Sequence, residues 1–330
     1  MKLNNFSVLI LLLTIAGTTS SVAQTRNDTL RVKAGKYLTN KFPGTRFLDF
    51  QYEQFSPTNY TSTLYGKDFE KGILSSQKRF KAALNFPIYM KEKFIISSSW
   101  RYKYETLSFK DVESYLVNEI GLQHDNHEDF HFFSGAFSFT YRSMLFNKNI
   151  VYNANLITDG SHKGFERFSA TFLAVMVMKR NHTTTMTLGA QFNTSPTAIF
   201  FVLPVFSLEH KLNDTWMLDL TFPKYGYIRK DVFGNGRLSA GIRYEGELFF
   251  TYPKQTGFMD TYTYNRNEIR TELMYEHHLS KNVIVTLRGG GTNVFWGQMK
   301  VKNSSDKLIK TSQNMNMFFN VGVSYNLIRK

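Results

Sequence analysis

The densest group of potentially reactive side chains lies between positions 124 and 131. It contains three histidines and three carboxylates: His124, Asp125, His127, Glu128, Asp129 and His131. Imidazole and carboxylate groups together suit a divalent cation. Their spacing matches no zinc motif, however, and a polar surface loop accounts for the same residues. We therefore expect no metal site here. The adjacent His277 and His278 point to opposite faces of a strand and cannot share a metal ion.

Serine and histidine side chains on strands are the candidates for an enzyme that acts on lipids. The residues to weigh are Ser97, Ser99, Ser134, Ser138, His131 and His278. A serine nucleophile needs a positioned base, and the sequence pairs none of these serines with one. The run 289–291 (Gly-Gly-Gly) lacks the Lys and Ser/Thr of a phosphate-binding loop, so close approach within a strand is its expected role. The sequence predicts neither catalytic residues nor a cofactor.

The composition excludes several classes of protein. The chain has 330 residues, no cysteine, 16% aromatic residues and a formal net charge of +14. A disulfide framework and cysteine-ligated metals are therefore excluded. The positive charge would attract nucleic acid or the phosphates of a membrane surface. The export signal described next argues against nucleic acid as a partner.

The first 23 residues have the pattern of a secretory signal peptide. Lys2 precedes a largely apolar run over 6–16, and small residues lead to Ser21-Val22-Ala23. The apolar run is too short to span a membrane comfortably. We expect cleavage before Gln24, which gives a signal peptide (1–23), a short periplasmic segment (24–45) and one large domain (46–330).

Strict alternation of apolar and polar residues dominates that domain. From 315 to 327 the odd positions are Met, Met, Phe, Val, Val, Tyr and Leu, while most even positions are polar. The same period of two recurs over 80–88, 94–104, 133–145, 238–250 and 269–277. This period is that of a strand with one apolar face. Many of the runs exceed ten residues, the length of a tilted strand that crosses a bilayer.

The alternation predicts an all-β, antiparallel transmembrane barrel of about 14 strands. The candidates are 46–56, 76–89, 93–109, 129–146, 149–159, 165–178, 182–194, 197–210, 214–222, 224–232, 235–251, 265–279, 282–299 and 311–328. Pro223 separates two short candidates, and merging or dropping them would leave 12 strands. Six turns on one side are short, whereas long loops are expected near 57–75, 110–128, 252–264 and 300–310. Such asymmetry is typical of outer-membrane barrels.

Here the chain resembles Gram-negative outer-membrane β-barrel proteins. The context Val22-Ala23-Gln24 and the closing strand rich in Asn and aromatic residues are similar to those of Bacteroidota. The resemblance covers 46–330, rests on architecture and points to an uncharacterised family. It implies location in the cell outer membrane, contact with membrane lipids and lipopolysaccharide, and recognition of the last strand by the barrel-assembly machinery. The Arg329-Lys330 tail departs from the usual terminal Phe.

Because alternate residues of a strand point to opposite faces, the apolar positions also predict which charged side chains line the lumen. They are Arg79, Lys81, Arg101, Lys103, Arg142, Arg243, Glu245, Glu247, Glu268, Arg270, Glu272 and Glu276. Opposite charges on neighbouring strands are expected side by side. A basic strip over 79–103 should face the acidic strand 265–279 across a narrow, water-filled pore.

Three functions fit a barrel of this size. A channel or transporter for small solutes is favoured, partly by analogy with the fold class. A structural or interaction barrel with an occluded lumen is the alternative, and an enzyme that modifies lipids is the third. Barrels of 12 to 14 strands lie between small forms filled by side chains and open 16-stranded porins, so size leaves the choice open.

Overall fold

The computed structural model describes residues 45–115, 126–195, 200–253, 261–302 and 307–327, which form one antiparallel sheet. The predicted signal peptide and nearly all of the segment 24–45 lie outside this part of the chain. The strands are β1 (Leu48–Phe55), β2 (Thr58–Leu64), β3 (Lys67–Met90), β4 (Phe94–Ser114), β5 (His127–Leu145), β6 (Lys148–Ser161), β7 (Gly164–Arg180), β8 (Thr184–Asn193), β9 (Val202–Lys211), β10 (Trp216–Phe222), β11 (Tyr225–Val232), β12 (Gly236–Thr251), β13 (Tyr262–His278), β14 (Val283–Val301), β15 (Lys307–Gln313) and β16 (Asn316–Tyr325).

These sixteen strands make a closed barrel with fourteen positions around its wall. β1 and β2 share one position, because both pair with β3 and only the short interruption at Ser56-Pro57 separates them. β15 and β16 share another, since both pair with β14. β1 pairs with β16 and β2 pairs with β15, which closes the wall. The prediction of a 14-stranded antiparallel barrel is confirmed. The weak place at 214–232 holds two separate paired strands, β10 and β11, so the 12-stranded alternative is wrong.

The outer face of the wall carries large apolar side chains. In β16, residues alternate strictly between buried and exposed, and Met317, Phe319, Val321 and Val323 are on the exposed face. The same holds for Phe133, Phe137 and Phe139 of β5 and for residues of most other strands. The alternation read from the sequence therefore gives the correct faces. No helix in the described residues is long and apolar enough to cross a membrane.

The region 57–75 is not the long loop that was expected. It contains β2, a tight turn at Tyr65-Gly66 with positive φ at both residues, and the start of β3. Here the apolar side chains Tyr60, Leu64 and Phe69 point inward, while Asn59 and Thr61 are exposed. The pattern is the reverse of a lipid-facing strand, which is why a search for apolar outer faces missed it. β4 and β15 also extend into the predicted loops 110–128 and 300–310, whereas 116–125, 254–260 and 303–306 lie outside the described residues.

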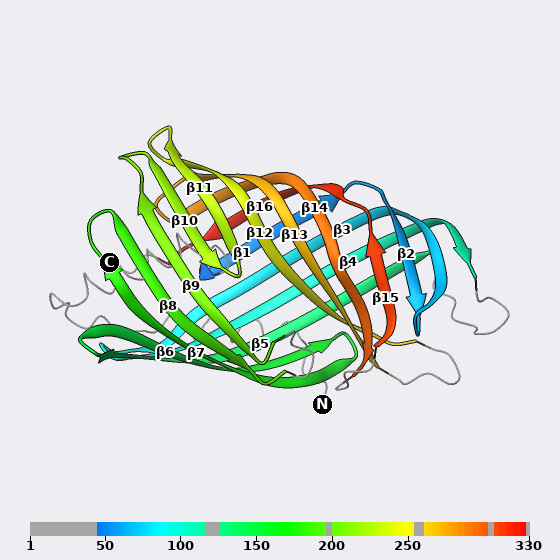
Figure 1. Cartoon of the computed structure of the whole chain (residues 1–330), viewed down its shortest axis with the longest axis horizontal. Helices are drawn as coiled ribbons and strands as arrows, with labels where there is room; N and C mark the ends of the chain where they lie inside the picture. The colour runs from blue at the N-terminus through cyan, green and yellow to red at the C-terminus, as the bar shows by residue number, and fades with distance from the viewer. Residues whose placement is uncertain (1–44, 116–125, 196–199, 254–260, 303–306, 328–330) are drawn as a thin grey trace, which may run out of the picture.

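The wall is not equally high all round. Among β6 to β11, β6 ends at Ser161 and β7 begins at Gly164, β8 ends at Asn193 and β9 begins at Val202, and β10 and β11 are joined at 223–224. β5 pairs with β6 only from Phe133 onward, and β12 pairs with β11 only up to Arg243. Beyond these points eight wall positions continue, namely β1/β2, β3, β4, β5, β12, β13, β14 and β15/β16. We call this extension the upper section and the fourteen-position part the lower section. In Figure 1 the low hairpins β8 to β11 lie on the left and the upper section ends on the right with β2 and β15.

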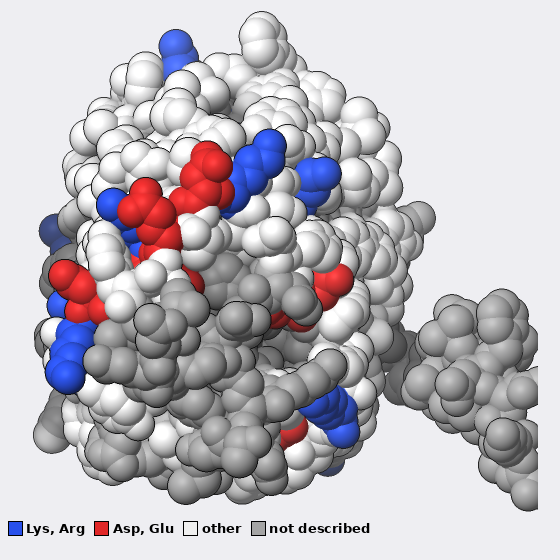
Figure 2. All heavy atoms as spheres, turned by 90° about the vertical axis from the view of Figure 1, so that its right-hand side faces the viewer, with Lys and Arg blue, Asp and Glu red and all other residues white. Residues whose placement is uncertain are grey.

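The two edge strands of the upper section, β5 and β12, approach each other across the barrel. Their Cα atoms come within 8 Å, although six wall positions lie between the two strands in either direction around the barrel. The upper section therefore closes on itself as a smaller, side-chain-filled barrel. Its interior holds two apolar clusters, one around Leu64, Phe69, Tyr262 and Leu308 and one around Tyr60 and its neighbours. Its end face, seen in Figure 2, carries Lys or Arg side chains close to Asp or Glu side chains.

Candidate functional site

The charged residues predicted to line the lumen lie on the inner faces of their strands, and most of them meet. Nine of the twelve belong to one network of ion pairs: Arg79, Lys81, Lys103, Arg243, Glu245, Glu247, Glu268, Arg270 and Glu272. The other three lie apart from it. Arg142 is half-buried near the opposite end of β5, and Glu276 binds Arg46 and Arg237. Arg101 projects into the lower section.

Arg79 of β3 is the centre of the network. Its Nε lies 2.6 Å from Glu105, and its Nη1 lies 3.0 Å from Glu53 and 2.8 Å from Glu247. Its Nη2 lies 3.2 Å from Glu268. The arginine side chain is 0% exposed. One guanidinium thus binds four carboxylates from β1, β4, β12 and β13, which stand on different parts of the wall.

The sequence analysis missed three members of this network. They are Glu53, Glu105 and Arg266, and each is at most 1% exposed. Arg266 contacts Glu105 at 2.5 Å and Glu268 at 2.8 Å. The alternation of faces along a strand could have identified two of them. Glu105 lies two residues from Lys103, and Arg266 lies two residues from Glu268, so each shares the inward face of its neighbour. The contact of β1 with this face depends on barrel closure, which no local pattern encodes.

The completed network is electrically balanced. It has six cations, Arg79, Lys81, Lys103, Arg243, Arg266 and Arg270, and six carboxylates, Glu53, Glu105, Glu245, Glu247, Glu268 and Glu272. Removing so many charges from water is costly, and only close pairing and additional hydrogen bonds offset that cost. The equal number of opposite charges therefore explains how a largely buried network persists.

Opposite charges do pair between β12 and β13, but not at every position of the register. The register places Arg243 opposite Arg270 and Glu245 opposite Glu268, so like charges face each other. Arg243 instead binds Glu272 at 3.1 Å along the diagonal and Glu245 at 2.7 Å on its own strand. Like charges directly opposite destabilise a sheet, so these contacts compensate for the register.

The basic strip over 79–103 and the acidic residues of the opposite wall are not separated by a water-filled pore where the ion-pair network lies. Lys81 lies 2.6 Å from Glu245 and 2.7 Å from Glu247, across the barrel. The Lys103 ammonium donates a hydrogen bond of 3.1 Å to the Leu248 carbonyl and also forms an ion pair with Glu247. The two walls are therefore in direct contact within the described structure, and ion pairs fill the base of the upper section.

Aromatic side chains close the contact between β5 and β12. Phe249 is 1% exposed and lies 5.3 Å from Phe130, measured between ring centroids. On the other face of β12, Phe250 stacks on Phe132 at 6.1 Å. The Lys103 ammonium lies 4.0 Å from the Phe249 ring and 4.9 Å from the Phe132 ring. Both faces of β12 are therefore covered here by side chains of β4 and β5.

The lower section has a different lining. Its inner face carries hydroxyl and amide groups that bond to one another along the wall. Asn155 donates to Thr171 at 2.9 Å and accepts from Ser138, and Thr187 bonds Ser207 at 2.7 Å. Asn155, Ser138, Thr187 and Ser207 are half-buried, whereas Thr171 is buried. A surface lined by hydroxyl and amide groups is compatible with water in the lumen.

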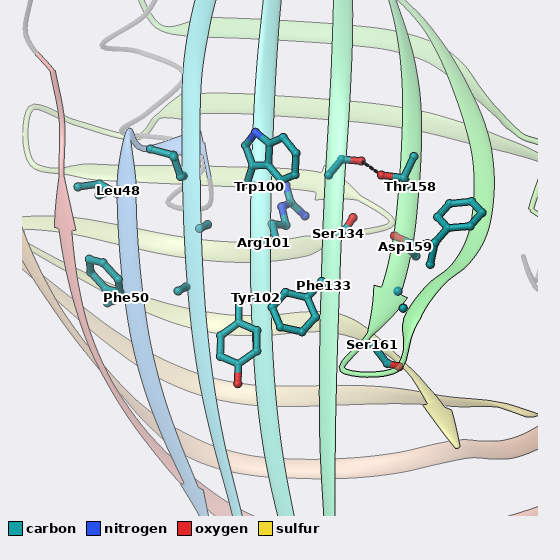
Figure 3. A pocket seen from close by; sticks show the side chains of 17 residues that line it. Leu48, Phe50, Trp100, Arg101, Tyr102, Phe133, Ser134, Thr158, Asp159 and Ser161 are labelled. Atoms are coloured by element: carbon teal, nitrogen blue, oxygen red, sulfur yellow. Dashed lines mark hydrogen bonds between the residues drawn. The ribbon is translucent and has the colours of Figure 1, made fainter. Parts of the chain in front are cut away.

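The outer wall beside this lumen has a groove of about 480 Å³ across β1, β3, β4, β5 and β6. Trp100 lies over Gly135, where an added Cβ would approach the indole to 3.1 Å. Phe50, Tyr102 and Phe133 line the same groove. In Figure 3 Arg101 extends away from Trp100, which follows from the alternation of β4. The groove belongs to the apolar outside and Arg101 to the lumen.

The serine and histidine candidates do not converge. Ser138 bonds Asn155, and His131 lies on the other face of β5, where it bonds the Tyr102 hydroxyl at 2.9 Å. In the described part of the chain, Ser97, Ser99, Ser134 and Ser138 form no hydrogen bond with a histidine. His127, Glu128 and Asp129 belong to strand β5 and not to a loop, while His124 and Asp125 lie outside the described residues. Among the described residues no three potential ligands gather to hold a metal ion.

One serine that the sequence analysis did not single out does contact a histidine. Ser108 Oγ lies 3.1 Å from His127 Nδ1, and His127 Nε2 lies 3.4 Å from Asp129. Asp129 also accepts a hydrogen bond from Tyr104 at 2.8 Å. All of these residues lie on the outer face of the upper section, and the His127 and Asp129 side chains are 58% and 44% exposed. The order serine, histidine, carboxylate is that of a nucleophile with its base.

Comparison with known proteins finds the same architecture and no relative by sequence. No protein-family model and no curated protein matches the chain. Solved structures that match include a Pseudomonas aeruginosa FadL homologue, with 7% identity, 84% of this chain and 89% of that chain covered, and a TM-score of 0.40.

Two further similar structures have different functions. The toluene transporter TodX of P. putida has 9% identity, covers 86% of this chain and 90% of its own, and has a TM-score of 0.38. The outer membrane phospholipase A of Escherichia coli has 10% identity, coverages of 89% and 99%, and a TM-score of 0.34. These scores carry no argument about what this chain does.

Proposed function

We propose that this chain is an outer-membrane channel or transporter for small solutes, exported through its predicted signal peptide. The observation that carries the proposal is the closed barrel with an apolar outer face and a wide lower section lined by hydroxyl and amide groups. Closed barrels that combine these two faces are the strand-built solution for crossing a bilayer. Lipids and lipopolysaccharide would then surround the wall, and β16 would be the strand read by the assembly machinery.

The route we propose enters from the side, above the low hairpins. Phe165, Phe192, Phe201 and Phe222 are exposed at the tips of these hairpins, as expected where a barrel wall meets the membrane surface. The upper section rises past this level with polar outer residues such as Asn59 and Thr61. A solute would reach the lower section between the hairpin tips and the upper section, and would avoid the ion-pair network.

Liposome swelling with glycine and with sugars of graded size tests the proposal. We expect glycine uptake by the wild type and at least a fivefold slower uptake by Thr187→Trp, because an indole at this position fills the lower lumen. Leu188→Trp is the matched control, since it places the same group on the outer face of the same strand.

No uptake of glycine by folded wild-type protein would contradict the proposal. It would favour the structural or interaction barrel, for which the filled upper section is the supporting observation. Equal uptake by the two tryptophan variants would instead contradict the proposed route through the lower section.

The Ser108, His127 and Asp129 group supports a second candidate function, an esterase on the outer face. His127 would take the Ser108 proton as the serine attacks an ester carbonyl, and Asp129 would hold the imidazole. Labelling with a fluorophosphonate probe tests this function. Labelling of the wild type that is lost in both Ser108→Ala and His127→Ala, and retained in Ser138→Ala, would support it; no labelling of the wild type would rule it out.

A further inference from the structure

Lys224 lies within electrostatic reach of three cationic side chains from other parts of the wall. Arg101 comes from β4, Lys224 from the turn between β10 and β11, Arg243 from β12 and Arg288 from β14. Lys224 interacts electrostatically with the other three and with Glu245. The backbone carbonyl of Lys224 accepts a hydrogen bond from Tyr244 N at 2.8 Å, which holds this turn against β12.

Two of these cations, Arg101 and Arg288, lie outside the ion-pair network. Arg288 is 6% exposed, and its Nε donates to the sulfur of Met274 at 3.2 Å. In the described part of the chain no carboxylate lies within ion-pair distance of Arg288 or of Arg101. Glu245 is the nearest shared carboxylate, and it already binds Lys81 and Arg243.

The other carboxylates that face Arg101 are also engaged. Arg101 interacts electrostatically with Asp49 and Asp159. Asp49 accepts hydrogen bonds from Gln51 and Ser324, both at 2.6 Å, and Asp159 binds Arg167. The Arg101 guanidinium is exposed inside the barrel and makes no hydrogen bond with a described residue. Its full set of donors faces the lumen.

Such an arrangement suits an anion. A guanidinium presents paired N–H donors that match the two oxygens of a carboxylate or phosphate. Arg288 is a buried cation with no carboxylate within ion-pair distance among the described residues, which is costly. An anion beside Arg288 that also reaches the exposed donors of Arg101 and the Lys224 ammonium gains more than it would at a single exposed cation. Water-filled lumens with fixed charges select their solutes in the same way.

We propose that the lower section contains a binding site for a small anionic solute that carries a carboxylate or phosphate group, formed by Arg101, Lys224 and Arg288. The proposal rests on the function proposed above and names the solute class. The occupant is a free solute rather than a lipid headgroup, because the three side chains project into the lumen and the apolar groove lies on the other face of β4.

Calorimetry on the full-length protein, folded in a zwitterionic detergent without lipid, tests the site. The probes are inorganic phosphate and succinate. We expect saturable binding of at least one probe by the wild type and at least a tenfold weaker affinity in the double variant Arg101→Gln/Lys224→Gln, since both side chains are exposed to the lumen and leave the buried network intact. Arg142→Gln is the matched control, because it removes a lumenal arginine outside the group.

Each other outcome overturns the proposal. The site does not exist if the wild type binds neither probe, or if the double variant binds as tightly as the wild type. If neither probe binds and short-chain phosphatidylglycerol binds in a way that depends on Arg101, the site belongs to a lipid headgroup and not to a free solute. Because calorimetry requires no conduction, a failure of glycine uptake with phosphate binding retained would contradict the channel and leave the site in place.

Discussion

The upper and lower sections share eight wall positions of one barrel and have opposite sidedness. In the lower section, Leu188 and Phe172 face outward and Thr187 and Asn155 face inward. In the upper section, Tyr60 and Leu64 are inside and Thr61 is outside. The surroundings explain the reversal, because a strand presents apolar groups to lipid and polar groups to water. The lower section thus has the sidedness of a membrane protein, and the upper section has the sidedness of a soluble protein.

The two sections also treat charge differently. At the base of the upper section, six cations and six carboxylates are paired and largely buried. The lower section keeps Arg101 exposed to the lumen and Arg288 without a carboxylate partner among the described residues. We infer that the first arrangement closes a wall and that the second remains available to a ligand.

The largest effect is expected from breaking the ion-pair network at its centre. Arg79→Met removes the cation that contacts four carboxylates and leaves them with fewer partners. Loss of one partner of a buried ion pair costs about 3–5 kcal/mol. We expect a loss of this size in the free energy of unfolding, measured by urea titration of protein folded in lipid vesicles.

Arg142→Met is the control for that substitution. Arg142 is half-buried and lies outside the network, so we expect a much smaller loss. Equal losses for the two variants would show that the paired charges at the base of the upper section have no special weight in stability.

A smaller effect is expected from reversing the sidedness of the wall. Leu188 is 50% exposed on the outer face of β8, and lysine on a lipid-facing strand near the bilayer midplane costs about 2–4 kcal/mol. Thr187→Lys, on the inner face of the same strand, should cost far less. Thr61→Lys should also be tolerated, because this outer face belongs to the upper section and meets water. The same urea titration measures all three variants.

The stability of Thr61→Lys shows whether the outer face of the upper section meets water or lipid. If Thr61→Lys destabilises as much as Leu188→Lys, the membrane covers the upper section too, and the proposed side entrance is wrong. Asn320, an inner residue that parity alone would also select as tolerant, is unsuitable as a control. It is fully buried and donates a hydrogen bond to Glu53 at 3.3 Å.

Sequence patterns were sufficient for the barrel and insufficient for its upper section. The apolar alternation of residues such as Phe319 and Val321 predicts lipid-facing strands and their number, because lipid imposes a sharp period of two. The strand β2 carries no such signal, since Tyr60 and Leu64 alternate with small polar residues in a short segment. Because the strands were predicted from long apolar outer faces, this segment was predicted to be a loop.

The candidate sites were predictable as sets of residues and not as contacts. Parity correctly placed Arg79, Glu247 and Glu268 on the inner face, but their meeting depends on how closely opposite walls approach. That approach follows from the short β6 to β11 hairpins, which leave β5 and β12 without neighbours. Lys224 was not singled out, because a lysine after a proline in a turn has no local feature that points it into a lumen.

The smallest effect is expected where the upper section rests on the low wall. The Tyr252 hydroxyl, just after β12, bonds Ser161 and lies 2.6 Å from Glu166 at the hairpin between β6 and β7. Glu166 also binds Lys302 at 2.7 Å, so it keeps a partner when the hydroxyl is removed. Tyr252→Phe should therefore lower the free energy of unfolding by only about 0.5–1.5 kcal/mol, the usual value for one hydrogen bond.

The pH dependence of that difference identifies the hydroxyl as its cause. Burial, and next the hydrogen bond to Glu166, raise the pKa of Tyr252 to about 12, whereas an unfolded tyrosine titrates near 10. Because the folded pKa is the higher one, the contribution is complete below about pH 10 and is lost as the pH rises through 12. We expect the stability difference between wild type and Tyr252→Phe to be constant from pH 7 to 9 and to shrink above pH 10. A difference that stays constant through pH 12 would assign the effect to ring packing, and the contact between the upper section and the low wall would then not depend on this proton.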